Sequence, residues 1–172
     1  MPTVKEATTS AHIQTVDGKA FSPVTERVHH HGRDPEAPGP ETLEGLAGDV
    51  QQISVYLMEA AGILKTIAEG HDDKVSPMCW ATGGLATRAS RRLSELSDAL
   101  HQGHTENVGC RIEDVGTMAL HAHGTARLAW ETAEQGGTSE MYSGSFAVAS
   151  NALNYCRRRL DHLLYEADLP LD

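Results

Sequence analysis

The side chains with the most obvious chemical potential are the ten histidines, above all His121 and His123 in the run Leu-His-Ala-His-Gly-Thr. Residues two positions apart point about 200° apart around a helix, so this pair cannot hold one metal ion together. His101 and His104 have a better spacing, but Gly103 between them indicates the end of a helix. No two Glu-x-x-His pairs of the kind that line di-iron bundles occur. We therefore predict neither a bound metal nor a cofactor.

Motifs that carry enzyme chemistry are missing from the chain. It contains no glycine-rich phosphate loop, no Gly-x-Ser-x-Gly nucleophile turn and no Cys-x-x-Cys pair. The apolar stripes described below also leave little room for a substrate pocket. We therefore expect no catalytic residues and a protein that is not an enzyme.

Two groups of three arginines, one in the second and one in the fourth predicted helix, could bind an anion or an acidic partner. They are Arg88, Arg91 and Arg92, and Arg157, Arg158 and Arg159. In an acidic protein they also balance carboxylates, as in the i,i+4 pair of Arg157 with Asp161, worth a few tenths of a kcal/mol. If the helices bring the two groups together, reversing Arg158 and Arg159 to glutamate should abolish partner capture and leave the melting curve unchanged.

Apolar residues that fall outside the helical stripes indicate a surface for another protein. Leu120, Gly124 and Leu128 recur at intervals of four in the third predicted helix, where two leucines flank a glycine notch. Val55 and Met58 fall outside the stripe of the first helix. Scattered exposed apolar residues are normal on protein surfaces, which is the alternative interpretation. We predict that these five residues bind a helix of a protein partner or of a second copy in a homodimer.

The residues described above lie in predicted helices. Apolar residues spaced by three and four positions predict these helices, because this spacing is typical of one buried face of an α-helix. Four such stripes span residues 43–67, 85–100, 108–133 and 146–167. The third is rich in alanine, so the bulk of the core must come from Leu57, Leu64, Leu153 and Leu160. The pattern predicts an all-α, antiparallel up-down-up-down four-helix bundle with coiled-coil-like seams.

Capping and stop signals predict where these helices begin and end. Pro40 is expected in the first turn of the first helix, and Ser76 before Pro77 is expected to cap the second. Thr105 and Ser139 are expected to cap the third and the fourth. The expected stops are three glycines and a proline: Gly70, Gly103, Gly136 and Pro170.

Residues 1–40 differ from the rest and are predicted to form an N-terminal arm, with the four-helix bundle in residues 41–172. Pro35, Pro38 and Pro40 make a stiff connector. Upstream, Asp17-Gly18 between short apolar runs has the form of a hairpin turn. A hairpin alone is marginal in water, so we expect the arm to be mostly disordered or loosely docked on the bundle. The arm could supply a second contact to a partner.

The charge of the chain limits its partners. The formal net charge is −10, and residues 41–172 hold ten lysines and arginines against nineteen acidic residues. An acidic body repels phosphate backbones and anionic membrane surfaces, so we expect no nucleic acid and no membrane as partner. The three cysteines form no close pair, and neither a signal peptide nor an apolar run of about 18 residues is present. These features favour a cytoplasmic location.

A four-helix bundle with an exposed histidine resembles the histidine phosphotransfer domains, which implies a phosphoacceptor role for His121. That family typically carries lysine at the third and glycine at the fourth position after its histidine, whereas Gly124 and Thr125 follow here. The resemblance supplies the alternative function, a phosphotransfer-like or small-ligand-binding bundle that uses His121. The function we predict is a non-enzymatic interaction module, a small regulator or adaptor that acts through its helix faces.

Overall fold

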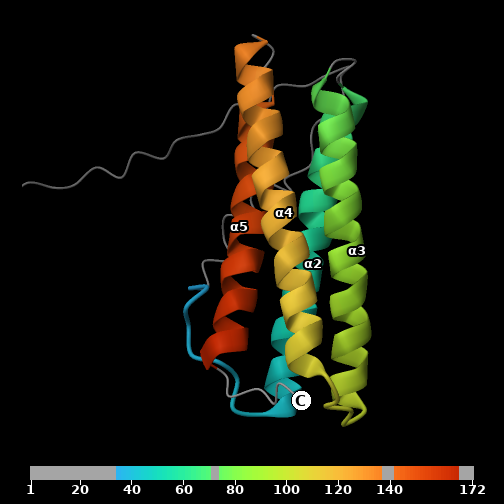
Figure 1. Cartoon of the computed structure of the whole chain (residues 1–172), viewed down its shortest axis with the longest axis vertical. Coiled ribbons are helices and arrows are strands. Elements are labelled where there is room, and N and C mark those ends of the chain that lie inside the picture. The colour runs from blue at the N-terminus through green and yellow to red at the C-terminus, as the bar shows by residue number, and fades with distance from the viewer. Residues whose placement is uncertain (1–33, 71–73, 137–141, 167–172) are drawn as a thin grey trace, which may run out of the picture.

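The computed structural model describes residues 34–70, 74–136 and 142–166. In these ranges the chain forms four helices and no strand: α2 (Leu43–Glu69), α3 (Val75–His101), α4 (Val108–Gln135) and α5 (Ser143–Glu166). They lie side by side along the long axis of the molecule (Figure 1). The predicted all-α class is confirmed. The hairpin and the disorder predicted upstream of residue 34 lie outside the described residues.

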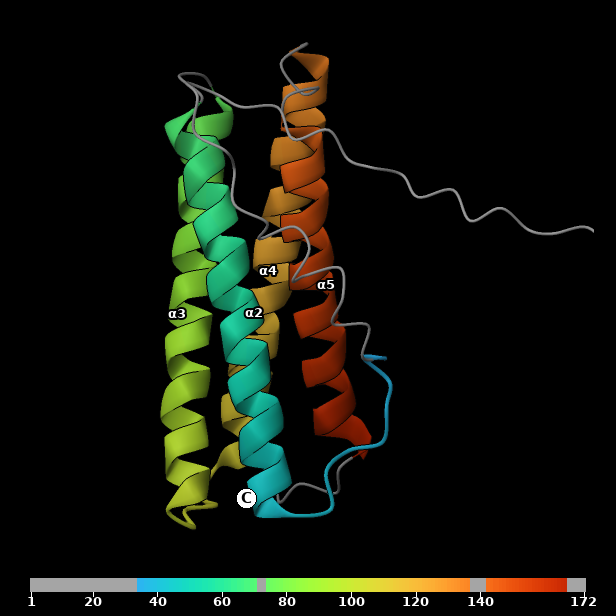
Figure 2. The same ribbon diagram turned by 180° about the vertical axis from the view of Figure 1, so that it is seen from behind.

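Each helix makes its main contacts with two others. α2 packs against α3 and α5, and α4 packs against the same two helices. α2 and α4 therefore stand at opposite corners of the bundle, and so do α3 and α5, as the two opposite views show (Figures 1 and 2). This arrangement decides which of the predicted site residues can meet.

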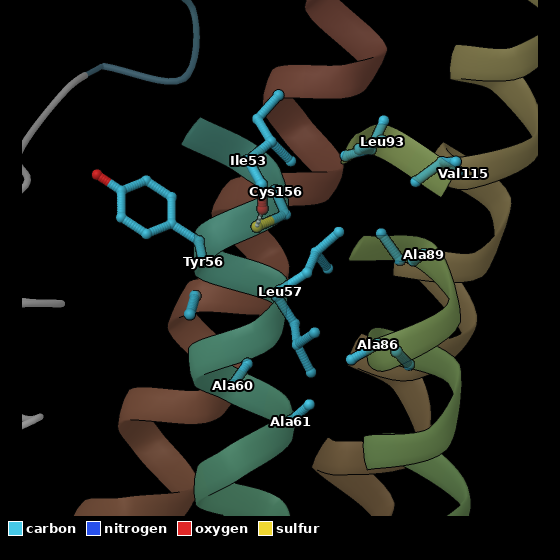
Figure 3. Close-up of a cluster of buried hydrophobic side chains, with 14 of the residues drawn as sticks. Ile53, Tyr56, Leu57, Ala60, Ala61, Ala86, Ala89, Leu93, Val115 and Cys156 are labelled. Atoms are coloured by element: carbon cyan, nitrogen blue, oxygen red, sulfur yellow. Dashed lines mark hydrogen bonds between the residues drawn. The ribbon is translucent and has the colours of Figure 1, made fainter. Parts of the chain in front are cut away.

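The predicted apolar stripes form one shared core. Leu57, Leu64, Leu153 and Leu160 are fully buried, which confirms that they supply its bulk. Every residue of the α4 stripe is also buried, from Val108 through its alanines. Figure 3 shows Leu57 pointing toward the alanines of α3. Two described members are less buried than predicted. Leu43 is 46% exposed, because it is the first residue of α2 and extends beyond the end of the core. Leu85 of α3 is half-buried at the edge of the core, and Ala167 lies outside the described residues.

Small residues spaced seven apart line the contact between α2 and α3, a pattern that the sequence analysis missed. In α2 they are Ala47, Ser54, Ala61 and Ala68, and in α3 they are Ser97, Ser90, Gly83 and Ser76. Each residue of the first set meets the one at the same place in the second, so the contacts step in opposite directions along the two helices. We call this contact the small-residue seam.

The serine hydroxyls of the small-residue seam form hydrogen bonds across the contact between α2 and α3. Ser97 donates to the carbonyl oxygen of Ala47 at 3.0 Å, and Ser76 donates to that of Ala68 at 2.8 Å. Ser54 donates to the Ser90 carbonyl at 3.0 Å, and its hydroxyl lies 2.8 Å from that of Ser94. Buried hydroxyls cost stability unless they are hydrogen-bonded, so these bonds allow polar side chains in a closely packed contact.

Three predicted helix starts are wrong. Thr42 caps α2, since its hydroxyl accepts a hydrogen bond from the Gly45 amide at 3.1 Å, and Pro40 precedes this cap instead of lying in the first turn. Ser76 does not cap α3 because that helix already begins at Val75, and its hydroxyl is used in the small-residue seam. Thr105 is exposed and lies ahead of the residue that caps α4. That residue is Asn107, in the left-handed conformation with φ 56°.

The predicted glycine stops are placed correctly, although only one uses glycine's conformational freedom. Gly103 has φ +78°. Its amide donates to the carbonyl oxygen of Leu100, and the amide of His104 donates to the carbonyl oxygen of Ala99. These two bonds define the left-handed C-terminal motif that satisfies the last carbonyls of α3. Gly70 and Gly136 follow α2 and α4 in right-handed helical conformation. Ser139 and Pro170 lie outside the described residues.

Candidate functional site

The predicted partner-binding residues of α4 lie on its outer surface. Leu120 is 49% exposed and Leu128 is 55% exposed. Gly124 lies between them, and a Cβ atom built on it would meet nothing within 4 Å. We call these three residues the leucine ridge. The ridge offers two apolar side chains on either side of an open backbone position.

The predicted residues of α2 lie on a different surface. Val55 and Met58 are 41% and 48% exposed. Because α2 and α4 stand at opposite corners, the five predicted partner-binding residues do not form one patch. Sequence reasoning also missed the exposed Trp80 of α3, whose ring lies under the Lys65 ammonium at 5.8 Å. Its bulk outside the apolar stripe of α3 was a signal that could have found it.

A groove between α4 and α5 was not predicted from the sequence. Its cavity has a volume of about 160 Å³, and Gly116, Leu120, Leu164 and Tyr165 are among the residues that line it. A second, more open depression along α5 is lined by Glu36, Arg158 and His162. The two share three lining residues, Arg157, Asp161 and Tyr165. We call the whole the α4–α5 groove.

The structure does not bring the two arginine groups together. Arg88, Arg91 and Arg92 are exposed on α3, which stands at the opposite corner from α5. Arg92 faces α4 instead, with its guanidinium 3.4 Å from the carboxylate of Asp114. The condition for one anion site made by both groups, that the helices bring them together, is therefore not met by this helix order, which the apolar pattern alone does not fix.

The arginines of α5 contact the chain itself. Arg157 forms the predicted pair with Asp161 at 3.1 Å. Arg158 pairs with the carboxylate of Glu36, upstream of α2. The segment that holds Glu36 runs beside the lower half of α5 in both views (Figures 1 and 2). The guanidinium of Arg158 is thus already paired with a carboxylate of the same chain.

Arg159 is the most deeply buried of these charges. Only 8% of its side chain is exposed, and it pairs with Asp49 of α2, whose side chain is 18% exposed. The same guanidinium donates to the carbonyl oxygens of Ala37 and Pro38. A guanidinium carries several donors in a fixed plane, so one side chain can hold α2, α5 and the segment before α2 together. This is a structural position and not a free anion site.

The histidines of α4 differ from each other. His121 is exposed, and its carbonyl accepts a hydrogen bond from Thr125 at 2.9 Å. His123 is half-buried, and burial, followed by the positive charges of Arg157 and Arg127, lowers its pKa below the ordinary value. At neutral pH the side chain of His123 is therefore uncharged.

The Cys156 thiol is buried in the core, whereas the free thiol of Cys110 is exposed. Burial raises the pKa of the Cys156 thiol, which keeps it protonated and inert. The sulfur donates to the Ile53 carbonyl at 3.8 Å (Figure 3). No group of three or more histidine, cysteine or acidic side chains is placed to hold a metal ion within the described ranges. None of the helices seen there has the length and apolar character needed to cross a bilayer.

Comparison of the chain with protein-family models, curated proteins and solved structures finds no match.

Proposed function

We propose that the protein is a non-enzymatic interaction module, an antiparallel up-down-up-down bundle that binds a helix of a protein partner or of a second copy. The contacts along α2 support this topology. They step in opposite directions between α2 and α3 in the small-residue seam. The same holds between α2 and α5, where Arg159 meets Asp49 and Cys156 meets Ile53.

The observation that carries the proposal is the leucine ridge. Two half-exposed leucines at positions i and i+8, with an open glycine between them, form the ridges and notch into which another helix can pack. Covering both leucines contributes about 2 kcal/mol of apolar burial, which suits a weak or regulated contact. The proposal includes a cytoplasmic location, which the free thiols support. The acidic charge argues against nucleic acid as the partner.

A second copy fits the ridge geometrically. A two-fold axis through Gly124 places Leu120 of one copy opposite Leu128 of the other, and the reverse. The helices can cross closely at that point because no Cβ atom stands between them. Such a two-fold contact would be self-complementary, because the same three residues meet on both copies.

The experiment is the double substitution Leu120→Glu and Leu128→Glu in the full chain. We expect the variant to lose self-association in sedimentation, or to lose a partner that co-purifies with the parent, while its melting temperature stays the same. The matched control is Gln51→Glu with Gln135→Glu, which adds the same charge at two exposed positions. The control should behave as the parent does.

Two results contradict the proposal. One is a parent that is monomeric and co-purifies with the same proteins as the double variant. The other is transfer of a phosphoryl group from a small phosphodonor to the parent but not to His121→Gln, since that outcome assigns the chain to the phosphotransfer alternative.

A further inference from the structure

The outer side of the contact between α2 and α3 carries residues that neither the core nor the leucine ridge uses. The Lys65 ammonium lies 5.8 Å from the centre of the Trp80 ring, so the exposed sides of the two helices meet at this point. The half-exposed Met58 precedes Lys65 by seven residues and therefore lies on the same side of α2. On α3 the surface continues from Trp80 at helical spacings of three and four. We call it the outer α2–α3 face, and its residues are Met58, Lys65, Trp80, Gly84, Arg88 and Arg91.

This face is poor in acidic residues although the chain as a whole has a net charge of −10. α3 carries no acidic residue from Val75 to Ser94. Residues 50–68 of α2 carry one, Glu59. Its charge acts on the thiol of Cys156, so Glu59 lies on the side of α2 that faces α5. The outer α2–α3 face is therefore a basic area on an acidic protein.

The two arginines of this face have no carboxylate partner in the described ranges. Five of the eight arginines there form ion pairs with carboxylates. Arg88 and Arg91 are exposed and form none within those ranges, although Glu95 follows Arg91 by four residues. The guanidinium of Arg88 instead lies 3.9 Å from the point where a Cβ atom of Gly84 would stand. Guanidinium groups match carboxylates in geometry, so these two are donors that a partner's carboxylates can use.

Lys65 is not available in the same way. Its ammonium pairs with Glu69 at 3.8 Å and lies over the Trp80 ring. The Trp80 side chain is nevertheless 48% exposed, as is that of Met58. The face thus combines two unpaired cations at one end with a large apolar contact area at the other.

The spacing of these groups along α3 favours an acidic helix as the occupant. Arg88 and Arg91 are about one turn apart, and Trp80 lies about 12 Å along the axis from Arg88. A helix lying along α3 matches this with two carboxylates one turn apart and an apolar side chain about two turns away. Gly84, between Trp80 and Arg88, has no side chain to hold the partner helix off. Nucleic acid fits less well, because the net charge of −10 repels a polyanion at long range.

We propose that the outer α2–α3 face binds an acidic amphipathic helix of another protein, with two carboxylates on Arg88 and Arg91 and an apolar side chain against Trp80 and Met58. The face belongs to α2 and α3, whereas the leucine ridge belongs to α4. The binding therefore does not rest on the proposed function, and it gives the chain a second contact of different chemistry.

The experiment is an NMR titration of the full chain with a defined peptide. The probe is an alanine-based helical peptide with two glutamates one turn apart and a leucine two turns from them. The chain has two tryptophans: Trp80 is the exposed reporter, and Trp130, packed against the core, is the reference. We expect the indole signal of Trp80 and the methyl signal of Met58 to move and saturate, while the Trp130 signal stays in place. Peptides with glutamine for glutamate, or alanine for leucine, should move them less at the same concentration.

A double substitution tests the role of the arginines. Arg88→Gln with Arg91→Gln should weaken peptide binding about fivefold, because two exposed ion pairs with the peptide are lost. The variant should fold as the parent does, since neither side chain has an ion-pair partner in the described ranges. The matched control is Arg92→Gln with Arg127→Gln, which removes the same charge at two exposed arginines outside the face. The control should bind the peptide as the parent does.

Four results overturn the proposal. One is a Trp80 signal that does not move as the glutamate peptide is added. Another is equal weakening in the two arginine variants, which would attribute binding to net charge alone. A third is movement of the Trp80 signal when the parent is concentrated without peptide, which would assign the face to a second copy. The fourth is a single-stranded oligonucleotide that moves this signal at a lower concentration than the peptide does.

The same titration separates this proposal from the proposed function. Leu120→Glu with Leu128→Glu leaves the outer α2–α3 face intact, so this variant should bind the peptide as the parent does. The arginine variant should in turn keep the self-association or the co-purifying partner that the leucine ridge provides. Failure of either proposal is therefore visible without failure of the other.

Discussion

The α2–α3 and α4–α5 contacts each contain a glycine that faces the neighbouring helix, with opposite results. A Cβ built on Gly83 of α3 would lie 3.3 Å from the Ala61 carbonyl oxygen, so the absence of a side chain lets the two backbones approach closely. A Cβ built on Gly116 of α4 would lie 3.9 Å from its nearest neighbours, Leu160 and Asp161 of α5. At Gly116 the missing side chain leaves part of a cavity of about 160 Å³.

The difference comes from what faces each glycine. Gly83 faces small residues of α2, in a contact where the neutral serine hydroxyls of both helices complete their hydrogen bonds. Gly116 faces a part of α5 that carries Arg157 and Asp161, whose charged ends must stay in contact with water. A glycine thus closes a contact between helices when its partner is small and neutral, and opens a groove when its partner is charged.

The largest effect is expected where α5 is held to α2 by charge. We predict that Arg159→Ala lowers the free energy of unfolding by about 3 kcal/mol, because it leaves the largely buried Asp49 without its guanidinium partner. Urea denaturation measures this loss. Arg158→Ala is the matched control, and its exposed pair with Glu36 should be worth less than about 1 kcal/mol. Equal losses in the two variants would show that Arg159 is not a structural residue.

This result also revises an expectation from the sequence. Reversing Arg158 and Arg159 to glutamate should not leave the melting curve unchanged, because the second substitution places a carboxylate beside that of Asp49. Loss of partner capture in that double variant would report unfolding and would say nothing about an anion site.

The next effect compares the two glycines directly. We predict that Gly83→Leu lowers the free energy of unfolding by about 2 kcal/mol, because the new side chain forces α2 and α3 apart. Gly116→Leu should be neutral or stabilising, since leucine favours a helix over glycine by somewhat less than about 1 kcal/mol and the side chain enters the groove. Thermal melts of both variants test the contrast, and equal destabilisation would remove the distinction between the two contacts.

A smaller effect is expected inside the small-residue seam. Ser54→Ala removes hydrogen bonds to Ser90 and Ser94 and should lower the free energy of unfolding by about 1 kcal/mol. Thr66→Ala is the control, because Thr66 is exposed and bonds only within its own helix, to Gly62. A stability of Ser54→Ala equal to that of the parent would mean that packing alone holds the seam.

The helices and the core could be predicted from the sequence, because one local property, the spacing of apolar residues, determines which face of each helix is buried. The seven-residue spacing of Ala47, Ser54 and Ala61 was equally available, and it went unused because small and polar residues do not count toward an apolar stripe. Two other features could not be found in this way. The partners of Arg159 lie about 110 to 122 positions away in sequence, and the groove depends on which helices stand at adjacent corners.

The smallest effect sharpens the comparison through His123 of α4, which feels the charge of Arg157, a residue that lines the groove. Burial and the charges of Arg157 and Arg127 lower the pKa of His123 in the folded protein, whereas the unfolded chain retains about the ordinary value of 6.5. Below that value the unfolded chain binds the proton more readily, so stability that is present above about pH 6.5 is lost as the pH falls toward the lower folded pKa. We predict that His123→Gln flattens the pH dependence of the unfolding free energy between pH 7.5 and 5. Parallel urea titrations of the variant and the parent measure the difference, and identical slopes in the two proteins would contradict the lowered pKa of His123.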